Sequence, residues 1–403
     1  MRSERSIIFL VGAVQFINIL DFMMVLPLGP DFAKALGIPN ALLGYIGGSY
    51  TAAAAVAGFA GSFFLDRFDR RKALAVAMTG LVIGTVAGGL ATGLASLMAA
   101  RVVAGMFGGP ATSIALAIIA DVIPVERRGK ALGAVMGAFS VASVVGVPLS
   151  LRLSLHGGWQ MPFFFVGGLG LVVVALSSSL LPSLRMHLQG PRPTQDSWRA
   201  LATLLSRPLV RLSYTMTATV MMAGFILIPN LSAYIQFNLG FERQYIDLLY
   251  MAGGAASFFT MRVAGWVVDR YGAFRAAAGA SAALLVLAYF WFIHFIPGTP
   301  IIIFFVGYMV ANSFRNVAHQ TLITKVPGPT ERARFMSIQS TVQHLASSLG
   351  AFTSARLLVE LPDHRLVGMP TVAAVSMVLT ALLPGLFYVV EGRLRMVISP
   401  RPA

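Results

Sequence analysis

An acidic residue interrupts an apolar stretch near the start of the chain. In the segment Asn18–Pro30, NILDFMMVLPLGP, Asp21 stands among isoleucine, leucine, methionine and valine. A carboxyl group in such surroundings can exchange a proton, because burial favours its neutral form and a nearby cation favours its charged form. Gln15 and Asn18 precede Asp21 at intervals of three and extend a polar ridge along one helix face. We therefore single out Asp21 as a candidate proton site; the alternative is a static ion pair that orients its helix.

A cation lies in a second apolar stretch, Arg101–Pro110, RVVAGMFGGP. Arg101, Gly105 and Gly108 share one helix face with Thr112, so this face is small and carries one charge. If the helix of Asp21 runs outward and that of Arg101 runs inward, the helical rise places Asp21 about 9 Å and Arg101 roughly 6–8 Å from the outer edge of a membrane, which are nearly equal depths. An unpaired charge at depth costs about 2.5–3.5 kcal/mol. We predict that Asp21 faces a cavity close to Arg101; the alternative for Arg101 is that it reaches the outer headgroups.

The composition predicts the elements that must position these side chains. Of 403 residues, 57% are hydrophobic and only 11% are charged, and the mean hydropathy is +0.78. This balance is typical of a membrane protein with spans of about 20 apolar residues. We expect an all-α membrane protein with twelve transmembrane helices, near residues 7–29, 41–65, 73–94, 97–121, 131–153, 160–181, 209–236, 245–268, 275–296, 299–324, 335–359 and 367–390.

The basic residues that give the net charge of +15 are distributed as expected for a membrane topology. Basic residues gather at alternate helix ends, which is the positive-inside pattern and places both termini in the cytoplasm, with the chain in the cell (inner) membrane. We therefore expect no nucleic-acid partner. Cysteine is absent, and no Ser/His/Asp constellation, metal-ligand cluster or nucleotide loop has usable spacing, so we expect no enzyme, no metal and no cofactor.

An internal repeat divides the chain. The stretch SFFLDRFDRR (62–71) matches GWVVDRYGAFR (265–275), PVERRGKA (124–131) matches GPTERARF (328–335), and Gly146 aligns with Gly350. The offset is about 203–205 residues each time, and a Pro- and Arg-containing stretch lies midway. We predict an amino-terminal six-helix bundle (1–182), a cytoplasmic linker (183–208) and a carboxy-terminal six-helix bundle (209–403), packed around a central cavity.

With these motifs the sequence resembles the major facilitator superfamily, and within it the twelve-helix drug:proton antiporter and AraJ-like efflux group. The loop motif of that superfamily, Gly-x-Leu-x-Asp-Arg-x-Gly-Arg-Arg/Lys, appears at 62–71 with both glycines replaced, by Ser62 and Asp69. The resemblance implies a gating loop that latches the bundles together at the cytoplasmic side; the alternative is a set of topology-setting charges. Its residues would be Asp66, Arg67, Arg70 and Arg71, with Asp269 and Arg270 in the second copy. The resemblance also implies a proton-coupling role for Arg101.

Polar residues in the second half are candidates for a substrate cavity. Asn312, Arg315 and His319 lie on one face of a span, and a membrane helix would turn such a face to a cavity or to neighbouring helices. The predicted cavity residues are Gln15, Asn18, Tyr234, Arg262, Asn312, Arg315, His319 and Gln343. Because arginines outnumber deep carboxylates in the spans, the cavity should favour neutral or anionic solutes.

These observations predict a secondary active transporter, working as a monomer in the lipid bilayer. It would export small amphipathic solutes by proton-coupled alternating access, with protons and a small-molecule substrate as its partners. One alternative keeps the fold and makes it an uptake carrier or a flippase for lysophospholipid-like anions. Another is a non-transporting membrane sensor.

Overall fold

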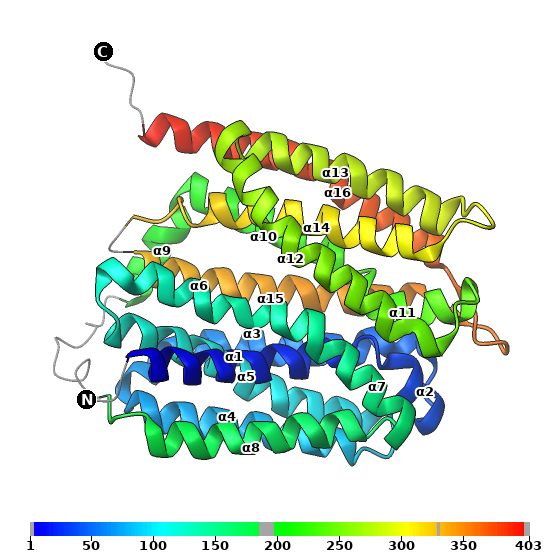
Figure 1. Cartoon of the computed structure of the whole chain (residues 1–403). Coiled ribbons are helices and arrows are strands. Elements are labelled where there is room, and N and C mark those ends of the chain that lie inside the picture. Colours follow the sequence, from blue (N-terminus) through cyan, green and yellow to red (C-terminus); the bar gives the residue numbers. More distant parts are fainter. Residues whose placement is uncertain (1–3, 185–196, 329–330, 399–403) are drawn as a thin grey trace.

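The computed structural model describes residues 4–184, 197–328 and 331–398, and its long helices run side by side (Figure 1). α1 (Glu4–Val25) begins and α16 (Met369–Ile398) ends at the same end of the molecule, on the left of Figure 1. We call this the termini end. The opposite end is the hairpin end, because β1 (Val359–Glu360) and β2 (Leu366–Val367) pair there as antiparallel strands between α15 and α16. This short hairpin is the one departure from the expected all-α fold among the described residues.

The first half of the chain forms six spans, of which the fifth is built from three helical pieces. Its further elements are α2 (Gly29–Leu36), η1 (Asn40–Leu42), α3 (Leu43–Phe64), η2 (Leu65–Arg67), α4 (Arg70–Gly89), α5 (Leu94–Val122), α6 (Val125–Val141), η3 (Ala142–Gly146), α7 (Val147–Gly157) and α8 (Met161–Leu180).

The second half repeats this order after α9 (Ser197–Ser206), a helix within the predicted linker; residues 185–196 of that linker lie outside the described residues. The linker and bundle boundaries, 183–208 between 1–182 and 209–403, stay predictions. The remaining elements are α10 (Pro208–Phe225), α11 (Ile228–Ala233), η5 (Tyr234–Asn238), η6 (Arg243–Tyr245), α12 (Ile246–Tyr271), α13 (Ala273–Ala288), η7 (Tyr289–Ile293), α14 (Ile301–Ile323) and α15 (Arg332–Leu357).

Every predicted span contains a helix, but not all are equally apolar. Within the described ranges, 10 helical stretches are long and apolar enough to cross a membrane. The other two predicted spans are α12 and α15, each a helix of 26 residues. A helix of that length extends about 39 Å, enough to cross a ~30 Å hydrocarbon layer. Both are more polar because they pack against the other bundle, α15 on α3 and α12 on η3 and α7.

Prolines accompany breaks in three spans that the sequence predicts as continuous, and in the seventh span the break after Phe225 precedes Pro229 of α11. α1 ends at Val25, two residues before Pro27, and Pro30 then lies in the first turn of α2. In the fifth span, the π-helical η3 separates α6 from α7 immediately before Pro148. Proline has no N–H to donate, so the chain widens or stops the helix there.

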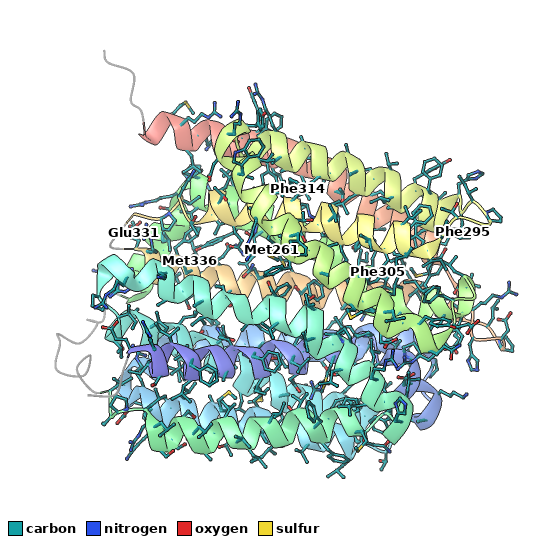
Figure 2. All side chains as sticks on the ribbon, in the orientation of Figure 1. Met261, Phe295, Phe305, Phe314, Glu331 and Met336 are labelled. Atoms are coloured by element: carbon teal, nitrogen blue, oxygen red, sulfur yellow. The ribbon has the colours of Figure 1, made fainter. Side chains whose placement is uncertain are left out.

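The two bundles approach most closely where glycine leaves room. A Cβ added to Gly44 of α3 would lie 2.2 Å from the carbonyl oxygen of Ala351 on α15, and one added to Gly254 of α12 would lie 2.8 Å from that of Ser143. Figure 1 shows α12 slanting across the molecule toward α7 at the hairpin end. Figure 2 places Phe295 at that end and Glu331 at the termini end. The outward faces are apolar, as a bilayer requires; examples are Phe9, Ile83, Phe259 and Val378, all exposed.

Candidate functional site

The structure brings Asp21 of α1 and Arg101 of α5 into a bidentate ion pair. Nη1 of Arg101 lies 3.0 Å from Oδ2 of Asp21, and Nη2 lies 3.2 Å from Oδ1. The two side chains are 0% and 1% exposed. Two parallel charge-assisted hydrogen bonds fix both orientation and charge more firmly than a single contact does. The proximity expected from their matching depths is therefore present.

A threonine completes this cluster from a third helix. The hydroxyl of Thr85 on α4 lies 2.6 Å from Oδ1 of Asp21 and 2.9 Å from the carbonyl oxygen of Leu81. A hydroxyl has one proton, so it can donate fully to only one of these two acceptors at a time. Nothing in the amino-acid pattern pointed to Thr85, because a lone threonine in a span is common and is often satisfied by its own helix.

Aromatic rings close the cluster off from water. The guanidinium carbon of Arg101 lies 5.5 Å from the ring centre of Phe163 on α8 and 5.9 Å from that of Tyr50 on α3. We expected Asp21 to face a cavity between the bundles, and this expectation was wrong. Its described partners all belong to the amino-terminal bundle, because helices packed through glycine enclose the pair.

The polar ridge of α1 continues this network toward the termini end. The side-chain amide of Asn18 donates to the carbonyl oxygen of Gly108 at 2.8 Å and to the hydroxyl of Thr112 at 2.5 Å. Tyr50 donates to Oδ1 of Asn18 at 2.9 Å. Gln15 is buried, and its Oε1 has no partner among the described residues.

The glycines of the Arg101 segment make room for this ridge. A Cβ on Gly105 would lie 2.2 Å from the carbonyl oxygen of Tyr50, and one on Gly108 would lie 2.4 Å from the Tyr50 hydroxyl. The small face predicted from the sequence therefore packs against α3 and α1.

The polar face predicted for the tenth span packs inside the carboxy-terminal bundle. Arg315 is 3% exposed and donates to Oδ1 of Asn312 at 2.6 Å. His319 lies 2.9 Å from the hydroxyl of Thr217 on α10, to which Gln339 of α15 also donates at 2.6 Å. These residues join helices of one bundle. Their contacts agree with the alternative that this polar face turns to neighbouring helices.

The other predicted cavity residues are not gathered into one cluster. Tyr234 is buried and donates to the carbonyl oxygen of Trp291 at 2.9 Å. Arg262 is exposed on α12, with its guanidinium 4.2 Å from the ring centre of Phe258. Gln343 is half-buried on α15. Whether any of them contacts a solute stays a prediction.

Charged contacts between the bundles gather at the hairpin end, and sequence reasoning missed them. Asp31 of α2 accepts two hydrogen bonds from Arg243, at 2.7 and 2.5 Å, across the bundle boundary. Arg152 pairs with Asp247 in the same way. The sequence signal available for them was the presence of opposite charges at the same end of the two halves.

An acid also caps a turn across the boundary. Glu360 of β1 accepts hydrogen bonds from the backbone and the side chain of Asn40 at the start of η1, the latter at 3.0 Å. Between described residues, the hydrogen bonds that join the bundles all lie at the hairpin end. That end is therefore closed in this structure.

The predicted gating loop lies at the termini end. Arg70 pairs with Asp121 at 3.2 Å, and Arg71 donates to the carbonyl oxygen of Leu181 at 3.2 Å, both within the amino-terminal bundle. Arg67 is exposed, and the side chain of Asp66 lies outside the described residues. In the second copy Asp269 and Arg270 are exposed, with Arg270 near the ring of Trp266.

Comparison with known proteins agrees with this architecture. The family model of the Major Facilitator Superfamily matches residues 11–351. Among solved structures, the chain is similar to a bacterial homolog of the human lysosomal transporter Spinster, in an inward-facing and occupied conformation, with a TM-score of 0.77, 16% identity and 100% of both chains covered.

Two further transporters share the fold. A D-xylose–proton symporter matches with a TM-score of 0.74 and 16% identity, over 94% of this chain and 96% of that one. The human organic anion transporter MFSD10 (TETRAN) matches with a TM-score of 0.63 and 18% identity, over 96% of this chain and 100% of that one. At such identities the likeness shows the fold alone.

Proposed function

The chain belongs to the Major Facilitator Superfamily, and from that premise we propose that it exports small amphipathic solutes, neutral or anionic, in exchange for protons. The observation that carries the proposal is the buried cluster of Asp21, Arg101 and Thr85. A coupling site must hold a proton in one conformation and release it in another. The ion pair with Arg101 holds the carboxylate in its charged form in this conformation, which meets the second requirement, and a conformation that separates the pair would meet the first.

The two acceptors of Thr85 support a proton-exchange role. With Asp21 charged, Thr85 donates to Oδ1 at 2.6 Å. With Asp21 protonated, the carboxyl group can donate to Thr85, whose own proton then turns to the carbonyl oxygen of Leu81 at 2.9 Å. Both protonation states thus keep a hydrogen bond between Thr85 and Asp21, so the proton can come and go without leaving the Thr85 hydroxyl unpaired.

The loss of the charge on Asp21 would also push the bundle to rearrange. A neutral Asp21 leaves the guanidinium of Arg101 without its counter-charge, since its other described contacts are aromatic rings and backbone carbonyls at 3.5 Å. An uncompensated buried charge is costly, so protonation favours a conformation in which Arg101 is hydrated. This links proton binding to alternating access.

The charge balance of the spans supports the solute class. Arg101 is neutralised by Asp21, whereas Arg262 and Arg315 have no carboxylate within ion-pair distance among the described residues. Surplus positive charge disfavours cationic solutes. Proton coupling and organic-anion transport are both named for proteins of this fold, the D-xylose–proton symporter and the human organic anion transporter.

The basic residues support the orientation that we propose, with both termini in the cytoplasm and the chain, as a monomer, in the inner membrane. Arg67, Arg127, Arg207 and Arg270 all lie near the termini end. The positive-inside rule assigns that end to the cytoplasmic side. The hairpin end, closed here, would then face outward.

Proteoliposomes test the proposal. Wild type, Asp21→Asn and the control Glu4→Gln, which alters an exposed acid on the same helix, are given anionic, neutral and cationic fluorescent amphipaths of similar size. An acidic lumen should drive accumulation of the anionic or neutral probe by wild type and by Glu4→Gln, as antiport requires. Asp21→Asn should retain probe exchange but lose the response to the gradient.

Two results would count against this proposal. Accumulation driven by an acidic exterior would indicate a symporter. Probe exchange that ignores the pH gradient in wild type as well as in Asp21→Asn would remove proton coupling altogether.

A further inference from the structure

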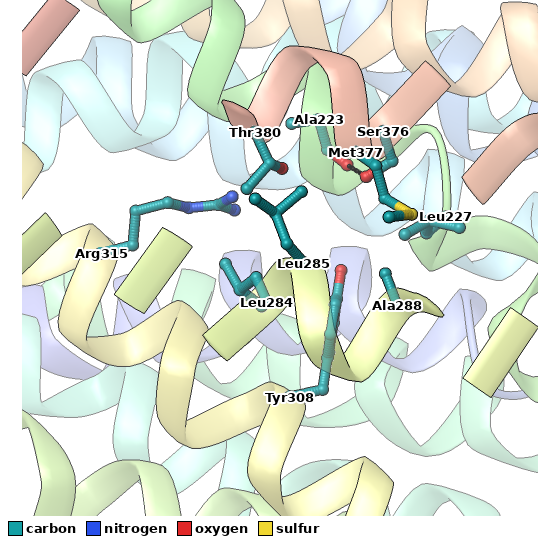
Figure 3. Close-up of a pocket in the computed structure, with 10 residues that line it drawn as sticks. All are labelled: Ala223, Leu227, Leu284, Leu285, Ala288, Tyr308, Arg315, Ser376, Met377 and Thr380. Atoms are coloured by element: carbon teal, nitrogen blue, oxygen red, sulfur yellow. Dashed lines mark hydrogen bonds between the residues drawn. The ribbon is translucent and has the colours of Figure 1, made fainter. Parts of the chain in front are cut away.

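A small pocket lies inside the carboxy-terminal bundle, apart from the boundary between the bundles. It is enclosed by α10, α13, α14 and α16, and Figure 3 shows Arg315 of α14 reaching into it from one side. The hydroxyl groups of Tyr308, Ser376 and Thr380 also line it, and Leu285 and Met377 supply apolar walls. Its free space is close to that of one water molecule.

The guanidinium at this pocket carries a charge without a counter-charge. Arg315 is 3% exposed, and its described hydrogen-bond partner is the neutral Asn312, at 2.6 Å. Its Nε has no partner, and no carboxylate lies within ion-pair distance of it among the described residues. Burying an unpaired cation costs several kcal/mol, so a group that neutralises it would be bound strongly.

The internal repeat shows what is missing. In the amino-terminal bundle the equivalent helices α1, α4, α5 and α8 hold Asp21, Thr85, Arg101 and Phe163 around one another. In the carboxy-terminal bundle the cation comes from α14, and a hydroxyl comes from Thr380 of α16. The helix equivalent to α1 is α10, which contributes Ala223, with Leu227 following it, in place of a carboxylate. The pocket therefore lies beside the helix equivalent to the one that carries the acid; the correspondence is between helices and not between positions, since Arg315 follows Arg101 by 214 residues (315 − 101) and not by 203–205.

We propose that this pocket binds a small monovalent anion, which supplies in the carboxy-terminal bundle the negative charge that Asp21 supplies in the amino-terminal one. Chloride and formate both carry the required charge and are among the smallest monovalent anions, although both are larger than water. The flexible side chain of Met377 can yield to admit them. Thr380 makes no hydrogen bond to another described residue, so its hydroxyl is available to donate to the anion. The site is independent of the proposed proton coupling.

Thermal unfolding of the purified protein at constant ionic strength tests this site. Chloride or formate replaces gluconate, a monovalent anion too bulky for the pocket, in stepwise titrations. A ligand that binds only the folded state raises the unfolding temperature with a saturable dependence on its concentration. Wild type should show this saturable rise, and so should Arg211→Gln, which removes an exposed arginine of α10.

The variants of the pocket should respond differently. Arg315→Gln should abolish the saturable rise. Thr380→Val keeps the shape and the cation but removes one donor, so the apparent dissociation constant should increase about tenfold. Equal curves in chloride, formate and gluconate for wild type would overturn the site. If Arg315→Gln does not fold, an unchanged dissociation constant in Thr380→Val would overturn it equally.

Discussion

Two ion pairs of the amino-terminal bundle have similar distances but very different surroundings. Arg101 and Asp21 lie 3.0 Å apart with almost no exposure, whereas Arg127 and Glu4 lie 3.0 Å apart with 63% and 39% of their side chains exposed. A buried pair gains strong attraction at the cost of desolvation, and removing one partner leaves the other charge stranded. Solvent screens the exposed pair, so either partner can be removed at little cost.

A double-mutant cycle should separate these two cases. Asp21→Asn and Arg101→Gln should each lower the free energy of unfolding by about 3–5 kcal/mol. The loss of unfolding free energy in the double variant should be smaller than the sum of the two single losses by about 2 kcal/mol or more, because neither charge is then left unpaired. A coupling of this size is expected for residues in direct contact. The cycle of Glu4→Gln and Arg127→Gln is the control, with a coupling below about 1 kcal/mol. Denaturant titration in detergent measures all of them; a coupling near zero for the buried pair would contradict this account.

The sequence predicts the ion pair because depth along a helix follows from residue number. It could not predict the enclosure of Asp21, because that depends on Gly84 and Gly105 bringing α4 and α3 against α5. A Cβ on Gly84 would lie 2.4 Å from the backbone nitrogen of Ala104. Such side-by-side contacts depend on three-dimensional packing, which periodicity along one helix does not record.

At the scale of elements, the two bundles use different acids to brace equivalent helices. In the amino-terminal half, Asp69 accepts from the backbone N–H of Arg71 at 3.0 Å, which caps α4, and from Ser183 at 2.6 Å and the N–H of Leu184 at 3.2 Å after α8. In the other half Gly272 stands at this position with φ +90°, and Glu391 of α16 accepts from the N–H of Phe274 at 2.6 Å. Each half thus joins an equivalent pair of helices, α4 with α8 and α13 with α16. The acid precedes α4 in the first pair and lies on α16 in the second.

This brace explains a departure from the superfamily motif. Asp69 stands where the motif has a glycine, and this aspartate caps α4 and accepts hydrogen bonds from the start of the predicted linker. Asp69→Ala should lower the free energy of unfolding by about 2 kcal/mol, as expected when an N-cap and a charged acceptor are lost together. Asp69→Asn, which keeps an acceptor oxygen, should lose less than half of that. Thermal unfolding checks the order, and equal stability of the alanine and wild-type proteins would refute the brace.

The number and order of the spans could be predicted because apolar length is a strong local signal. The polar helices α12 and α15 were still found, since their ends are marked by the repeat at Asp269 and Glu331. The breaks within spans were harder to place. Pro148 alone does not tell whether the helix bends, stops or widens into the π-helical η3, because that choice depends on the neighbours Leu20 and Gly254 that pack there.

At the scale of the whole molecule, the hairpin end is closed and the predicted gating loop lies at the opposite end, as we propose for one state of a transport cycle. The contacts Asp31–Arg243, Arg152–Asp247 and Asn40–Glu360 all cross the bundle boundary. The side chains of Arg243 and Asp31 are 19% and 18% exposed, and that of Arg152 is 55% exposed beside the buried Asp247; at exposed positions a salt bridge contributes little and can be exchanged for water. Such contacts suit a gate that must open and close repeatedly.

Locking the gate should therefore stop transport. The chain contains no cysteine, so Asn40→Cys with Glu360→Cys introduces one thiol on each bundle and nothing else that can react. Joining the two thiols with a short cross-linker should reduce probe exchange in proteoliposomes by more than tenfold, and a reducible linker should restore it on cleavage. Each single-cysteine variant, treated identically, should exchange probe at the wild-type rate. Full exchange by the cross-linked protein would mean that the hairpin end does not open during the cycle, and that alternating access at this end is not how the chain moves its solute.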